Sequence, residues 1–117
     1  MADNQVVKVL SVDITSGATL SAALDLVQGW SEAAVAIGTF ASATDVYFHA
    51  ATTSDGTYRR VAHPIVNTGT AELNDWKIES GIAARVVPLP IGYQFVKFEL
   101  STGQTDTTTT LDVICKS

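Results

Sequence analysis

Few side chains of this chain could bind a metal or act as a strong nucleophile: two histidines, His49 and His63, and one cysteine, Cys115. Zinc takes three or four nitrogen, sulfur or carboxylate ligands in proteins, so these residues would need carboxylates to complete a site. Nothing in the sequence places Asp45 or Asp55 for that role. The sequence therefore predicts no metal site, and it shows no motif for a cofactor.

Catalytic motifs are also missing. Serine, histidine and aspartate are all present, so composition alone does not exclude a catalytic triad. However, the Gly-x-Ser-x-Gly nucleophile motif is absent, as are the Gly-x-Gly-x-x-Gly and P-loop patterns that hold phosphates. Asp55 and Asp106 could be calcium ligands in loops, but a turn explains Asp55 without an ion. We predict no catalytic residue and a protein that is not an enzyme.

The charge of the chain narrows the class of partner. Its net charge is −5, its pI is about 4.7 and only 16% of its residues are charged. Nucleic-acid binding needs clustered lysine and arginine, and the one basic run, Arg59-Arg60, would point to opposite faces of a strand. The low charge fits a protein that packs against other proteins. It equally fits a small β domain in which serine and threonine replace charged residues.

Localisation signals are absent from the sequence. No apolar run approaches the ~20 residues of a membrane helix, and Met1–Gln5 lacks the features of a secretory signal. We therefore expect a protein that is made in a cytoplasm, stays soluble and does not enter a membrane. The single cysteine excludes an intrachain disulfide, and alternation with Leu111 and Val113 predicts that Cys115 is a buried core residue.

We expect these residues to lie on β-strands and in the turns between them. Valine, isoleucine and threonine are abundant in the sequence, and turn residues recur at intervals of about one strand length. We predict one domain, residues 1–117, with an all-β antiparallel β-sandwich fold of jelly-roll type and about eight strands. The predicted strands are Val6–Ile14, Ala18–Leu26, Ala33–Phe40, Asp45–Thr52, Tyr58–Ile65, Leu73–Glu79, Ala83–Leu89, Tyr93–Leu100 and Thr110–Lys116.

Four segments carry more specific predictions. In Ala18–Leu26 the leucines alternate as in a strand, although helical spacing is the rival interpretation. Asp55-Gly56 predicts a hairpin turn with positive φ angles. Ser101–Thr110, with six threonines, predicts a hairpin loop. Pro88 and Pro90 predict a strand end or a sheet edge, because proline cannot donate to a ladder.

Four aromatic residues are candidates for contact with a partner. Trp30 and Trp76 stand near expected loops, where each ring either plugs one end of the sandwich or forms an exposed platform for a sugar or a protein. Tyr93 and Phe95 alternate onto the face opposite Val96 and Phe98. On an outward face such rings would fit a contact between subunits, whereas under a covering loop they would belong to a second layer of core.

Three motifs occur in order along residues 18–117. They are Leu20-Ser-Ala-Ala-Leu-Asp-Leu26, the strand–Ser-Asp-Gly–strand pattern of Asp45–Val61, and Phe95-Val-Lys-Phe98. In this the chain resembles small bacteriophage and prophage virion proteins of the head-decoration, or cement, kind. The resemblance implies a virion protein, made in the host cytoplasm, that binds the major capsid protein or other virion proteins and assembles as a homo-oligomer, most often a trimer. It implies a function in stabilising the head across neighbouring capsid subunits.

A second resemblance gives the alternative function. The Ser-Asp-Gly hairpin is also similar to one in discoidin-like, galactose-binding-like jelly-roll modules. That resemblance implies a carbohydrate-binding or host-adhesion module. The chain departs from those modules because it is shorter, carries no secretion signal and shows no clear histidine, arginine and aromatic trio on neighbouring loops.

Overall fold

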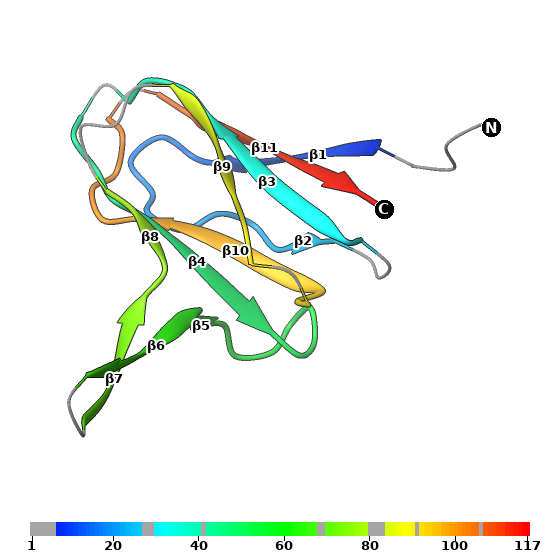
Figure 1. Ribbon diagram of the computed structural model, residues 1–117. Coiled ribbons are helices and arrows are strands. Elements are labelled where there is room, and N and C mark those ends of the chain that lie inside the picture. The colour runs from blue at the N-terminus through cyan, green and yellow to red at the C-terminus, as the bar shows by residue number, and fades with distance from the viewer. Residues whose placement is uncertain are drawn as a thin grey trace.

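The computed structural model describes residues 7–26, 30–40, 42–67, 70–79, 84–90, 92–105 and 107–117, which form an all-β structure without helices. Two antiparallel sheets pack face to face (Figure 1). Sheet A has the order β1 (Val7–Ile14), β11 (Thr109–Lys116), β3 (Glu32–Ile37), β9 (Arg85–Pro88). Sheet B has the order β2 (Leu24–Asp25), β10 (Phe95–Leu100), β4 (Val46–Ala51), and both β5 (Arg59–Arg60) and β8 (Lys77–Ile78) pair with the far edge of β4.

The path of the chain is that of a jelly roll. Strands β1, β2, β3 and β4 alternate between sheets A and B, and β8, β9, β10 and β11 alternate again on the way back. The order β1-β11-β3-β9 therefore faces β2-β10-β4-β8, which is the eight-stranded double Greek key. A hairpin of β6 (Ala62–Asn67) and β7 (Thr70–Asp75) is inserted between β5 and β8, and Figure 1 shows it projecting from the sandwich. The predicted fold class is confirmed.

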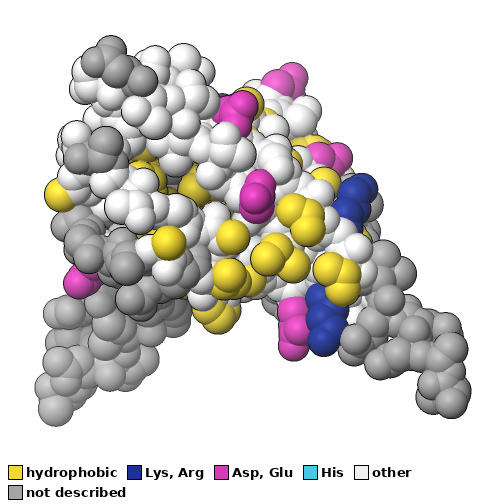
Figure 2. Space-filling view, turned by 90° about the horizontal axis from the view of Figure 1, so that it is seen from above, with side chains coloured by type: hydrophobic (Ala, Val, Ile, Leu, Met, Phe, Trp, Pro, Cys, Tyr) yellow, Lys and Arg dark blue, Asp and Glu magenta, His cyan; other side chains and the backbone are white. Residues whose placement is uncertain are grey.

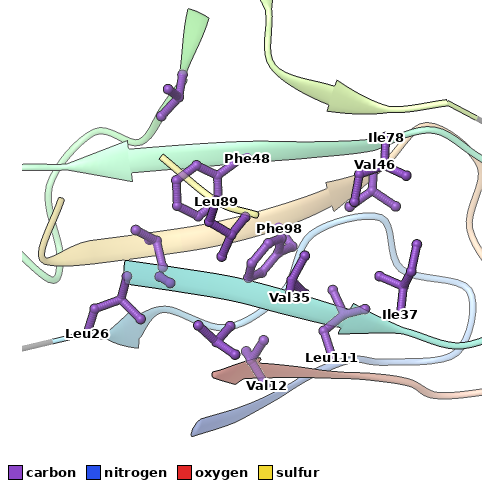
Figure 3. Close-up of a cluster of buried hydrophobic side chains, with 14 of the residues drawn as sticks. Val12, Leu26, Val35, Ile37, Val46, Phe48, Ile78, Leu89, Phe98 and Leu111 are labelled. Carbon is purple, nitrogen blue, oxygen red and sulfur yellow. The ribbon is translucent and has the colours of Figure 1, made fainter. Parts of the chain in front are cut away.

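The core lies between the two sheets because alternate residues of each strand point inward. Burial alternates along β3 and β10, and along β11 from Thr110 onward. Phe48 and Phe98 meet in the middle with ring centroids 5.3 Å apart, as the alternation predicts (Figure 3). Cys115 is fully buried, and burial raises the pKa of its thiol. Pro88 ends β9, which is an edge strand of sheet A, so the proline prediction is confirmed.

Two predicted strands, Tyr58–Ile65 and Leu73–Glu79, are each divided between two sheets, the second at Trp76 between β7 and β8. The chain leaves sheet B after Arg60 and enters the β6–β7 hairpin at Ala62. Val61 lies between the two strands. Its N–H donates to the carbonyl of Phe48, and its carbonyl accepts from the N–H of Trp76. Its side chain is buried. A period-two pattern does not show this break, because the alternation continues while the pairing strand changes.

The prediction for Ala18–Leu26 was wrong in extent. Only Leu24–Asp25 form a strand, and Leu20, which the alternation groups with Leu24 and Leu26, is 43% exposed. Ser21 is buried in its place, because its hydroxyl accepts from the N–H of Phe98 at 2.9 Å while its own N–H donates to the carbonyl of Phe98. This segment therefore follows β10 with few ladder bonds, and the helical alternative does not occur.

The segment Ser101–Thr110 is not a hairpin loop, and its last two residues, Thr109 and Thr110, already belong to β11. It crosses from β10 in sheet B to β11 in sheet A. Gln104 is buried within it, with its amide oxygen accepting from the N–H of Ser42 and its amide nitrogen donating to the carbonyls of Ser42 and Thr102. The carbonyl of Gln104 accepts from the N–H of Gly17, so this one residue joins three loops at that end of the sandwich.

The Asp55-Gly56 turn has a different geometry from the one predicted. Positive φ angles occur at Gly17 and Gly92, and not at Gly56. The N–H of Gly56 instead donates to the carbonyl of Thr53 at 3.2 Å, which closes a tight turn inside a longer loop between β4 and β5. Because that loop has seven residues, it does not need the left-handed conformation of a two-residue hairpin.

Three residues named in the sequence predictions lie outside the described residues: Val6, Ala83 and Asp106.

Candidate functional site

The two tryptophans pack against the core. Trp30 is half-buried, and its indole Nε1 donates to the carbonyl of Leu26. The ring of Trp76 meets the ring of Phe48 edge-on, with centroids 5.7 Å apart. These contacts agree with the interpretation of the rings as part of the packing, and neither ring stands clear of the protein as a platform.

Tyr93 and Phe95 do not share one face, so that prediction was wrong for Tyr93. Strand β10 begins at Phe95, and Tyr93 precedes it in a turn after Gly92, whose φ is 100°. The Tyr93 ring stands edge-on to the buried Phe48 at 6.3 Å and is still 39% exposed. Phe95 is half-buried on the outer side of sheet B together with Lys97 and Glu99, as predicted.

The outer side of sheet B carries a network of charged side chains. Glu99 Oε1 accepts from His49 Nε2 at 2.8 Å and from Arg60 Nε at 3.0 Å. Arg60 also binds Asp75 at 3.1 Å, and its guanidinium lies 3.8 Å from the centroid of the Tyr47 ring. The network joins β4, β5, β7 and β10, so it holds the base of the β6–β7 hairpin against sheet B.

Electrostatics favour the ionised form of Glu99. Partial burial acts to raise the pKa of Glu99, but the hydrogen bonds from Arg60 and His49 outweigh it and hold that pKa below its usual range. An ionised carboxylate only accepts, so the hydrogen lies on Nε2 of His49. His49 Nδ1 is buried without a hydrogen-bond partner among the described residues. The arrangement links neighbouring strands through ion pairs and hydrogen bonds.

The other histidine, His63, has a side chain that is not among those that the structure describes.

Unlike the outer side of sheet B, the outer side of sheet A carries a row of apolar side chains. Antiparallel register aligns Val9 with Ile114, Ile114 with Ala34, and Ala34 with Pro88 in one row across all four strands. Figure 2, which looks down on this side, shows hydrophobic side chains gathered there with charged side chains at the border. We call this surface the apolar face, and it consists of Val7, Val9, Ala34, Ala36, Val86, Pro88 and Ile114.

The apolar face is open to solvent at its largest side chains. Val7, Val9 and Val86 are 61%, 56% and 57% exposed. Asp112 of β11 stands on the same side between Ser11 and Ala36, so one carboxylate interrupts the apolar side chains. Exposed apolar side chains that gather on one side of a sheet are common where proteins contact each other. A shallow depression opens at one end of the face, lined by residues that include Ala34, Pro88 and Ile114 together with Glu32 and Lys116.

Sequence reasoning missed the apolar face, although a signal was present. In Val7–Ile14 both phases of the alternation contain large apolar residues: Val7 and Val9 in one, and Leu10, Val12 and Ile14 in the other. A strand at the border of a sandwich needs only one apolar side. The apolar residues on the second side of this strand, Val7 and Val9, were therefore the signal. Only the register with β11, β3 and β9 shows that the apolar surface continues across the sheet.

Comparisons with known proteins found no relatives. No family model matches the chain, and neither a curated protein nor a solved structure matches it. Along the part of the chain that the structure describes, no helix is long and apolar enough to cross a membrane. In the same residues, no three or more histidine, cysteine, aspartate or glutamate side chains gather as a metal site.

Proposed function

We propose that this chain is a structural protein of a bacteriophage virion, a capsid decoration protein that stabilises the head by binding across neighbouring capsid subunits. The observation that carries the proposal is the apolar face, since a β-sandwich that leaves such a surface open is built to contact other proteins. The outer side of sheet B holds a network in which His49, Arg60, Asp75 and Glu99 already bind one another, so sheet A is the better contact surface.

Two further arguments support a virion protein. Jelly rolls are common in viral capsid domains, which is an argument by analogy of fold. The three ordered motifs around Leu20–Leu26, Asp45–Val61 and Phe95–Phe98 add the resemblance to decoration proteins. Many symmetric copies on a lattice would raise the effective affinity of a weak contact by orders of magnitude. The expected partners are the major capsid protein and further copies of this chain, in a trimer if the resemblance extends to assembly.

The proposal is tested by mixing the purified chain with capsids assembled from the major capsid protein encoded in the same phage or prophage. We expect the chain to co-sediment with the capsids at a saturating ratio and to raise the temperature at which they fall apart. Capsids that neither bind the chain nor gain thermal stability would contradict the proposal.

One observation favours the alternative, a carbohydrate-binding or host-adhesion module. A shallow groove beside the β4–β5 loop is lined by the exposed Tyr93 with Thr52, Arg59 and Gln94 among its neighbours. An aromatic ring flanked by hydrogen-bonding side chains can bind a sugar. A glycan array with Tyr93→Ala as the variant tests this function. Binding that is lost in Tyr93→Ala would favour it over the capsid proposal, and an array without signal would contradict it.

A further inference from the structure

We infer that the apolar face of sheet A binds the same face of a second copy of this chain, with the two sheets stacked about a two-fold axis. The inference rests on the proposed function in one respect, that the protein acts by contact, and it names a second copy as the occupant of the apolar face. A paired chain would then bind a capsid through surfaces other than this face. It replaces the trimer implied by resemblance with a pair as the first unit of assembly.

The charges at the border of the face argue for a second copy. Lys116 of β11 lies opposite Glu32 of β3 in the register, so both signs of charge stand side by side at one end of the face. A partner surface of a single sign would match one of these residues and repel the other. A copy related by symmetry presents both signs, as an isologous contact requires.

Two simple placements of the axis each put Lys116 opposite a carboxylate. Facing sheets share a two-fold axis that lies between them, parallel to the sheets. If the axis runs along the strands, β11 and β3 are the two central strands of sheet A and cover each other, so that Lys116 meets Glu32 of the second copy. If the axis runs across the strands through the row of Ile114, β11 covers β11, and Lys116 meets Asp112.

The shape of the face also suits sheet stacking. Branched side chains at Val9 and Ile114 stand in one row with the small Ala34, which leaves room for interdigitation at the ~10 Å spacing of packed sheets. The face covers roughly 400 Å², from strand spacing and rise. That is about half of the ~800 Å² per partner of a standard interface, so we expect weak pairing that depends on concentration.

Sedimentation velocity over a concentration series from micromolar to millimolar tests the inference. We expect the wild-type chain to pass from monomer to dimer. Val9→Glu should raise the dimer dissociation constant about tenfold or more, because it places a carboxylate in the apolar contact. The matched control is Leu20→Glu, an exposed apolar residue next to sheet B, which should leave pairing unchanged. A chain that stays monomeric, or an assembly that Val9→Glu does not weaken, would overturn the inference.

Charge exchange identifies the axis. Lys116→Glu should weaken pairing, and one second substitution should restore it: Glu32→Lys if the axis runs along the strands, or Asp112→Lys if it runs across them. Restoration by either supports two-fold stacking. Pairing that is insensitive to Lys116→Glu, or restored by neither substitution, would contradict it.

The capsid experiment separates this inference from the proposed function. A wild-type chain that pairs but does not bind capsids would end the decoration proposal and leave the pairing intact. A chain that is monomeric in solution and loses capsid binding in Val9→Glu would assign the apolar face to the capsid, and would overturn the pairing.

Discussion

At the scale of single residues, Gln104 is a polar side chain that is buried and stabilises the loops around it through hydrogen bonds. It is 2% exposed, and its amide satisfies both the N–H and the carbonyl of Ser42. Gln104→Ala would leave these two backbone groups without partners, so we expect the free energy of unfolding to fall by about 2–3 kcal/mol. Urea denaturation measures it, with the exposed neighbour Thr105→Ala as a control that should stay within about 0.5 kcal/mol. Equal effects of the two substitutions would show that the amide contacts are unimportant.

At the scale of elements, the Glu99 network makes the attachment of β4, β5 and β7 to β10 depend on pH. The pKa of Glu99 is lowered in the folded state, so its contribution is complete above the ordinary glutamate value of about 4.3 and is lost as the pH falls through the folded-state value. Glu99→Gln should lower the free energy of unfolding by about 1–2 kcal/mol at neutral pH. The difference from wild type should shrink in acid below about pH 4. Denaturation curves from pH 7 to pH 2.5 measure this, with the exposed Glu79→Gln as control, and a constant difference would exclude the mechanism.

At the scale of the whole molecule, two valines of the same strand separate folding from assembly. Val12 is 5% exposed in the core and Val9 is 56% exposed on the apolar face. Val12→Glu buries a carboxylate without a partner, so it should lower the free energy of unfolding by about 3 kcal/mol or more. Val9→Glu should change the stability of the monomer by less than about 1 kcal/mol. Circular dichroism during chemical denaturation compares them at a concentration below pairing, and similar losses would place both side chains in one core.

Much of the fold was predictable because period-two alternation is local. The inward positions of Phe48, Phe98 and Cys115 followed from their neighbours in the sequence, and the all-β class followed from composition and spacing. The division of Tyr58–Ile65 at Val61, the turn that removes Tyr93 from the outer face and the crossing of Ser101–Thr110 were not predictable in this way. The break at Val61 and the crossing near Gln104 involve hydrogen-bond partners far away in the sequence, and the turn before β10 involves the positive φ of Gly92, which alternation does not show.

The sequence by itself determined that this chain forms strands and which side chains of most strands point inward, since a strand alternates at every second residue whatever its neighbours are. Only the tertiary structure decided what lies on the outside. Residues 9, 34, 88 and 114 come from four distant segments, and they form one apolar row because sheet A places β1, β11, β3 and β9 side by side in a single register. Strand order and register arise from long-range pairing, and a local pattern contains neither.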